Sequence, residues 1–192
     1  MKIRYIAACV LATGAIGARG ADVTMFRTIN EAASLSGCST SGACTSVSVQ
    51  RFDDFTNGSM VGTISAVISN PSGPIFFQIV NCSGPQFAGA LVLNHANGNA
   101  TIKVTLDPST PGCSGVNFFE PFTIDLVGRA NGNIHISVDG FFTNELNGFI
   151  SRGKTREDRF SDNFEGTVGS LSGPIFGGSV SATRNSRHEQ VQ

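Results

Sequence analysis

The chain has 192 residues, with 13 Lys and Arg against 14 Asp and Glu and a formal net charge of −1. Hydrophobic residues make up 40% and charged residues 14%, which is too apolar and too neutral for a disordered chain. The near-neutral charge argues against a nucleic-acid binder. No apolar run reaches the ~18 residues that a membrane-spanning helix needs, so a polytopic membrane protein is excluded.

The first twenty residues have the layout of a secretory signal peptide. Lys2 and Arg4 form a short basic region, residues 5–18 are apolar and rich in alanine, and small residues follow. This order predicts residues 1–20 as a signal peptide that is cleaved after Ala18 or Gly20. We therefore expect a secreted, extracellular or periplasmic protein with no transmembrane segment after cleavage. Cleavage removes three basic residues and no acid, which leaves a modestly acidic mature chain.

Four cysteines follow the predicted signal peptide: Cys38, Cys44, Cys82 and Cys113. An even number in an oxidising compartment predicts two disulfides, for which three pairings are possible. We favour Cys38–Cys44, which closes a small polar loop, and Cys82–Cys113 largely by elimination. The intervals lack the paired C-x₂-C spacing of a zinc site, and we predict neither a metal site nor a cofactor.

Residues 29–36 are the one good helix candidate. Thr28 and Glu31 have the spacing of a capping box, and Gly37 stands where a helix stop is expected. After Cys44, short runs of Val, Ile, Phe and Thr alternate with polar residues between glycine-rich turns. The sequence therefore predicts an all-β fold, an antiparallel β-sandwich or small β-barrel with one short N-terminal helix.

The strands are expected, in chain order, at residues 45–52, 59–69, 75–82, 87–95, 100–107, 121–129, 133–142, 147–156, 160–171 and 175–183. Turn residues recur about every ten positions, as is typical of antiparallel hairpins. We expect one all-β domain at residues 21–184. The polar residues 185–192 are expected to form a flexible tail.

A hairpin is predicted around Asn97-Gly98. A two-residue turn there places Leu93 opposite Ile102 and puts every apolar side chain of both strands on one face. Such a pattern specifies the register strongly. His95 borders this turn and is expected to be an ordinary surface residue.

A second hairpin is predicted at residues 131–132, with a three-residue loop and Gly132 in the left-handed conformation. In this register Asp125 lies across from Ser137, on the face that His135 shares. Ser, His and Asp on one face suggest a nucleophilic site. A flat strand offers neither a sharp turn that exposes the serine nor donors for an oxyanion, so we interpret the face as solvated and predict no catalytic residue.

Acidic residues gather at Asp53-Asp54 and within residues 157–165. Calcium takes several oxygen ligands from one loop, but neither group has the spacing of a known calcium loop. Loops that form Asx turns are the commoner explanation.

Two phenylalanine pairs, Phe118-Phe119 and Phe141-Phe142, place one ring on each side of a strand. One ring of each pair is then a candidate for exposure. That arrangement suits either a sheet covered on both faces or a hydrophobic partner site.

Four basic residues, Arg152, Lys154, Arg156 and Arg159, lie within eight positions. On a strand, Arg152, Lys154 and Arg156 share one face. This stripe is our candidate binding site for an anionic ligand or an acidic protein. The alternative is an edge strand whose charges prevent aggregation, which the neighbouring Glu157 and Asp158 favour.

The leading functional hypothesis is a secreted or surface-associated, non-catalytic binding protein with an unknown protein or an anionic ligand as its partner. The first alternative is an extracellular hydrolase that uses carboxylates on adjacent strands, with Asp125, Asp139 and Asp162 as candidates. The second is a structural component of a coat or matrix, which the Gly-, Ser- and Phe-rich composition suits.

Overall fold

A computed structural model describes residues 23–39, 42–71, 73, 76–146 and 149–191. The predicted signal peptide, residues 1–20, lies outside the described residues. Within the described part of the chain, no helix is both long and apolar enough to cross a lipid bilayer.

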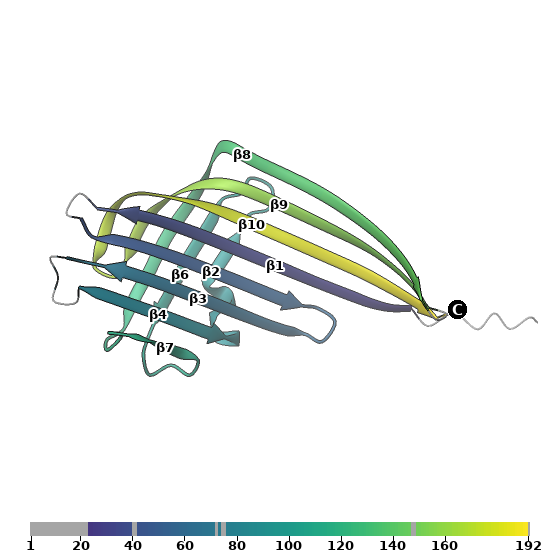
Figure 1. Ribbon diagram of the computed structural model, residues 1–192, viewed down its shortest axis with the longest axis horizontal. Coiled ribbons are helices and arrows are strands. Elements are labelled where there is room, and N and C mark those ends of the chain that lie inside the picture. Colours follow the sequence, from purple (N-terminus) through teal and green to yellow (C-terminus); the bar gives the residue numbers. More distant parts are fainter. Residues whose placement is uncertain (1–22, 40–41, 72, 74–75, 147–148, 192) are drawn as a thin grey trace, which may run out of the picture.

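Ten strands and one short 3₁₀ helix make up the described part of the chain. They are β1 (Val23–Cys38), β2 (Cys44–Asp54), β3 (Ser59–Ser69), β4 (Phe77–Gly84), η1 (Pro85–Ala90), β5 (Leu91–Leu93), β6 (Ala100–Leu106), β7 (Cys113–Val116), β8 (Phe122–Leu146), β9 (Phe149–Val168) and β10 (Leu171–Val191). They form one sheet in the order β5-β6-β8-β9-β10-β1-β2-β3-β4-β7, and the paired neighbours are antiparallel. The sheet curls into a half-barrel (Figure 1), so the predicted all-β antiparallel class is confirmed.

The core lies on the inner face of the curled sheet. In β2, Val47 and Val49 are buried while Ser46 and Ser48 between them are exposed, as a half-covered strand requires. The helix η1 packs on β2 and β3, and β5 contacts β1 and β2, so the sheet partly encloses its own inner face. The largest fully buried side chains are Phe164, Ile64, Leu91, Ile102, Leu106, Ile124 and Leu126.

The predicted helix at residues 29–36 is wrong, because this segment is the second half of β1. Ala33 and Leu35 are buried while Ser34 and Ser36 are exposed, which is the two-residue period of a strand. The segment pairs with β2 on one side and β10 on the other. These partners are far away in sequence, and their pairing overrides the local helix preference of the alanines.

The first hairpin forms, but with a longer loop than predicted. Leu91 pairs with Ile102 and Leu93 with Ala100, which is two positions away from the expected register. A shift of two keeps each side chain on its face, so Leu91, Leu93 and Ile102 are buried as expected. The backbone of Asn94 donates to the carbonyl of Asn99 at 2.8 Å and closes the loop over residues 94–99.

The second predicted hairpin is wrong, because β8 runs as a single strand past residues 131–132. Gly132 has a φ of 75°, the expected left-handed conformation, but it lies in an irregularity where the pairing with β9 shifts between Ala130 and His135. An inserted bulge of this kind lets one strand pair along the whole length of its neighbour. In the same way, residues 149–156 and 160–168 of two predicted strands belong to the single strand β9, and residue 171 already begins β10.

Besides residues 29–36, other segments of the sheet were not expected as strands. The first part of β1 and the short strand β7 are among them. Residues 185–191, which we expected to form a flexible tail, are the last part of β10 and pair with β1 and β9. Figure 1 shows β1, β8, β9 and β10 extending together beyond the ends of the other strands.

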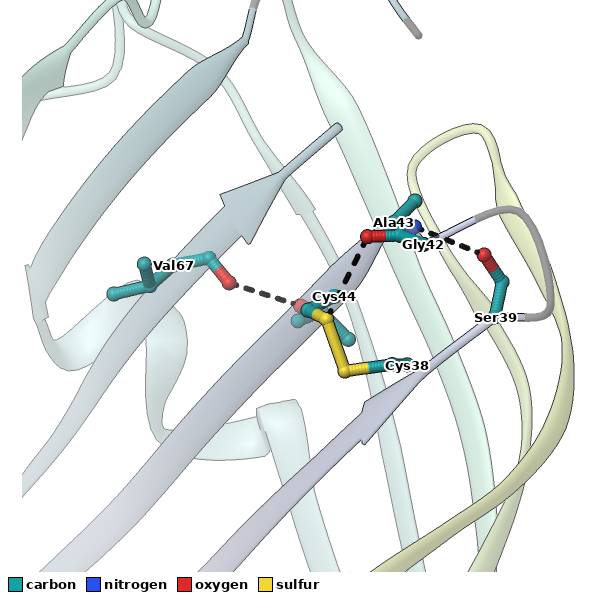
Figure 2. The surroundings of a disulfide bond; sticks show 7 residues. Cys38, Ser39, Gly42, Ala43, Cys44 and Val67 are labelled. Atoms are coloured by element: carbon teal, nitrogen blue, oxygen red, sulfur yellow. Dashed lines mark hydrogen bonds between the residues drawn. A yellow bond between two sulfur atoms is a disulfide. The ribbon is translucent and has the colours of Figure 1, made fainter. Parts of the chain in front are cut away.

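Both predicted disulfides are present. Cys38 and Cys44 lie opposite each other at the ends of β1 and β2, with Cα atoms 3.9 Å apart (Figure 2). Inside their loop the backbone N–H of Ala43 donates to the hydroxyl of Ser39 at 3.2 Å. Cys82 and Cys113 join β4 to β7 across a separation of 31 residues. Two disulfides are consistent with an oxidising compartment.

Candidate anion-binding site

The predicted basic stripe lies on the inner face of the sheet, beyond the apolar core. Arg152, Lys154 and Arg156 are exposed and alternate along β9, in phase with the buried residues Phe160 and Phe164 of the same strand. The face that forms the core therefore continues outward as a charged surface. We call this part of the inner face the basic end.

Arg159 does not belong to the basic end. Its position places it on the outer face of β9, where its guanidinium lies 2.6 Å from the carboxylate of Glu157. Both partners are partly exposed, so the pair contributes little stability. Of the four residues proposed for binding, Arg152, Lys154 and Arg156 therefore share the inner face of β9, and the fourth lies on its outer face.

Two arginines that the sequence did not indicate join the stripe. Arg184 of β10 lies directly opposite Arg156, and Ser186 lies between Lys154 of β9 and Arg27 of β1. Together these strands form a pocket of about 310 Å³. Its lining residues are Arg27, Thr28, Lys154, Arg156, Arg184, Asn185 and Ser186. We call it the basic pocket.

Arg156 is compensated by a buried carboxylate. Its Nε donates to Oδ2 of Asp158 at 3.1 Å, and its Nη2 donates to Oδ1 at 3.2 Å. Burial would raise the pKa of Asp158, but hydrogen bonds from Arg156 and Ser137 outweigh it and hold that pKa below its ordinary value. The same hydrogen bond raises the pKa of Arg156. Asp158 thus fixes one wall of the basic pocket.

The other cations of the basic pocket are compensated weakly. Lys154 lies 3.9 Å from Asp139, and both side chains are nearly half exposed. Among the described side chains, no carboxylate lies within 4.0 Å of Arg27 or Arg184. Arg184 also faces Arg156 across the strands, and like charges in that position repel. The basic pocket therefore holds excess positive charge that an anion would neutralise.

A buried ionic layer separates the basic pocket from the core. Glu31 is 6% exposed and its Oε1 lies 2.7 Å from Nε2 of His95, while Arg51 holds Asp53 at 2.7 Å. His95, which we expected to be an ordinary surface residue, thus ties the loop between β5 and β6 to β1. These contacts fix the inner face next to Arg27 and Arg184, because Glu31, Arg51 and Asp53 lie on the same side of neighbouring strands as these two arginines.

The predicted Ser-His-Asp face is not assembled. Asp125 lies opposite Lys103 of β6, whose ammonium is 2.8 Å from its carboxylate. Ser137 lies instead opposite Asp158 of β9, on the inner face. The side chain of His135 lies outside the described residues. Because the predicted hairpin is absent, Asp125 and Ser137 lie far apart along the single strand β8 and do not face each other.

The carboxylates proposed for a hydrolase are also spread apart. Asp125 lies on the outer face, Asp139 lies beside the basic pocket, and Asp162 is 1% exposed. Burial raises the pKa of Asp162 to about 6, and neither oxygen has a hydrogen-bond partner in the described part of the chain. The acidic group at residues 157–165 divides between the two faces of β9, so it does not form one calcium loop.

A second pocket, of about 430 Å³, lies at the opposite end of the strands. Exposed Phe119 and Pro121 and half-buried Phe122 form one side of it, and Asn70, Gln78 and Asn117 also line it. The side chain of Asn117 is held by its own hydrogen bond to the carbonyl of Phe77 at 2.7 Å. This second pocket lacks the converging charges of the basic pocket.

Comparisons with known proteins add little. No protein-family model matches the sequence, and no curated protein is significantly similar to it. Among solved structures, a protein of Nitrosomonas europaea provisionally described as AttH matches with 11% identity and a TM-score of 0.29. The match covers 86% of this chain and 51% of that protein, so the chain spans about half of its length. A match at this level carries no argument about function.

Proposed function

We propose that this protein is a secreted or surface-associated, non-catalytic binding protein that holds an anionic ligand in the basic pocket. The observation that carries the proposal is the convergence of Arg27, Lys154, Arg156 and Arg184 from three strands, where the ion pairs among the described side chains involve Asp139 and Asp158. The predicted signal peptide and the two disulfides support the location.

The chemistry of the lining suits recognition of oxygen-rich anions. Guanidinium and ammonium groups supply several N–H donors, and Ser186, which lies between Lys154 and Arg27, adds a hydroxyl. A guanidinium binds two oxygens of a carboxylate, sulfate or phosphate at once. The contact of Glu31 with His95 and the ion pair of Arg156 with Asp158 are already formed without a ligand. Little further ordering of the pocket is therefore needed on binding.

The test is calorimetric titration of the mature protein with inorganic sulfate, in chloride buffer at constant ionic strength. Arg184→Gln removes one charge-assisted hydrogen bond worth about 1.5 kcal/mol, so the Kd should rise about tenfold. Arg159→Gln is the matched control, because Arg159 is on the outer face of β9. It should leave the Kd unchanged. Raising the salt concentration should weaken binding to the wild type.

Two results would contradict the proposal. One is the absence of sulfate binding to the wild type at low ionic strength. The other is an equal loss of affinity in Arg184→Gln and Arg159→Gln, which would mean that sulfate responds to net charge and not to the basic pocket.

A further inference from the structure

Large apolar side chains stand beside the cations of the basic end. Phe141 is 75% exposed and lies directly opposite Lys154 in the pairing of β8 with β9. Met25 is 61% exposed and lies two residues before Arg27 on the same face of β1. Phe55, in the turn after β2, is 53% exposed. Single exposed apolar residues are ordinary, but here they border one charged pocket.

Two aromatic rings are paired with cations of the basic pocket. The ammonium of Lys154 lies 5.3 Å from the ring centroid of Phe141, and the guanidinium of Arg27 lies 5.1 Å from that of Phe55. Lys154 and Arg27 lie on either side of Ser186, so the two pairs flank the pocket. A cation–π contact orients the cation while the ring stays exposed. The basic pocket is thus bordered by both positive charge and exposed apolar surface.

An inorganic anion would use only half of this surface. It would neutralise Arg27 and Arg184 and leave Phe141 and Met25 in water. A molecule that joins an anionic group to an apolar chain uses both parts, because the chain covers the ring while the head group accepts hydrogen bonds. The residues lie on the inner face of a curled sheet, which suits a single molecule better than a flat bilayer.

We propose that the ligand of the basic pocket is an anionic amphiphile: a carboxylate, sulfate or phosphate head group that carries an apolar chain. The head group lies between Arg184 and Lys154, and the chain lies against Phe141 and Met25. This inference rests on the function proposed above and names its ligand class.

The test is a series of n-alkyl sulfates, from ethyl to octyl, titrated below their micelle-forming concentrations beside inorganic sulfate. The charged group is constant, so any trend reports the chain. Complete burial of a methylene strengthens binding about fourfold, and half burial about twofold. We expect the Kd to fall by about twofold to fourfold per methylene until the chain extends past Met25.

Matched variants separate the two parts of the site. Phe141→Ser should flatten the dependence of the Kd on chain length, so that its loss of affinity grows from inorganic sulfate to octyl sulfate. Arg184→Gln should weaken all members of the series by the same factor. Phe119→Ser is the control, because Phe119 is also 75% exposed but lines the second pocket at the other end of the strands. Circular dichroism and thermal melting check that each variant folds.

The outcomes distinguish this inference from the proposed function. Sulfate binding with no dependence on chain length overturns the inference and leaves the proposed function standing. No binding of any sulfate overturns both. Equal effects of Phe141→Ser and Phe119→Ser also overturn the inference, as does binding to anionic vesicles without binding to the monomeric alkyl sulfates. Sedimentation that shows a dimer dissociated by Phe141→Ser overturns it too, because a second copy would then cover the ring.

Discussion

Asp162 allows a quantitative test of the core. Its side chain is 1% exposed and lies on the inner face of β9 between Phe160 and Phe164. Neither carboxylate oxygen has a hydrogen-bond partner among the described residues. Burial raises its pKa from 3.8 to about 6. Asp162→Asn removes the charge and keeps the shape, so it isolates the cost of ionising this group.

The sign of the effect follows from the direction of the shift. In the unfolded chain the carboxyl ionises near pH 3.8, whereas in the folded protein it keeps its proton until about pH 6. The stability contributed by this group is therefore complete below pH 3.8 and is lost as the pH rises through 6. A shift of roughly two pKa units corresponds to about 3 kcal/mol.

The assay is urea denaturation of the wild type and Asp162→Asn at several pH values from 4 to 8. The difference in the free energy of unfolding should grow from near zero at pH 4 to about 3 kcal/mol at pH 8, with the variant more stable. Other titrating groups are common to both proteins and cancel in the difference. A difference that stays constant across this range would refute the assignment of a raised pKa to Asp162.

Two further changes test packing and cross-linking. Gly98 and Gly132 both have positive φ, but a Cβ at Gly98 would collide with the ring of Phe160, whereas a Cβ at Gly132 meets nothing within 4 Å. Gly98→Ala should lower the free energy of unfolding by about 3 kcal/mol and Gly132→Ala by about 1 kcal/mol. Equal losses in urea denaturation would contradict this packing. Replacing Cys82 and Cys113 by serine frees a separation of 31 residues and should cost about 3–4 kcal/mol; an unchanged thermal midpoint would count against it.

The parts of the fold that follow from local chemistry could be predicted from the sequence. The alternation in residues 59–69 and 100–107 gave strands close to β3 and β6, because one face of each is buried. The pairing of Cys38 with Cys44 follows from their nearness in the chain. Gly132 was correctly expected in the left-handed conformation, but its place in a bulge depends on the distant strand β9.

The basic pocket could be predicted only in part. The stripe on β9 was visible because Arg152, Lys154 and Arg156 are close in sequence. Arg27 and Arg184 are isolated basic residues, and only the pairing of β1 with β10 brings them to Lys154 and Arg156. That pairing was hidden because residues 29–36 were interpreted as a helix and residues 185–192 as a flexible tail. These two interpretations together concealed half of the candidate site.

A substitution at Glu31 distinguishes experimentally between the helix predicted at residues 29–36 and the strand β1. As the last residue of a capping box, Glu31 would be replaced well by glutamine, since both side chains can cap. In the structure it is a buried partner of His95 at 2.7 Å, next to Arg51. A hydrogen bond to a buried carboxylate contributes about 1.5–3 kcal/mol, so Glu31→Gln should lower the free energy of unfolding by about 2 kcal/mol.

Glu157→Gln supplies the matched comparison for this prediction. Its ion pair with Arg159 has a similar length, 2.6 Å, but both side chains are partly exposed. The loss on breaking it should stay below about 1 kcal/mol. Urea denaturation at pH 7 measures both variants. If Glu31→Gln cost no more than Glu157→Gln, Glu31 would not be buried against β2 and the loop that carries His95, and the inner wall next to Arg27 would lack its support. A clear difference between two pairs of similar length would show that burial decides their contribution.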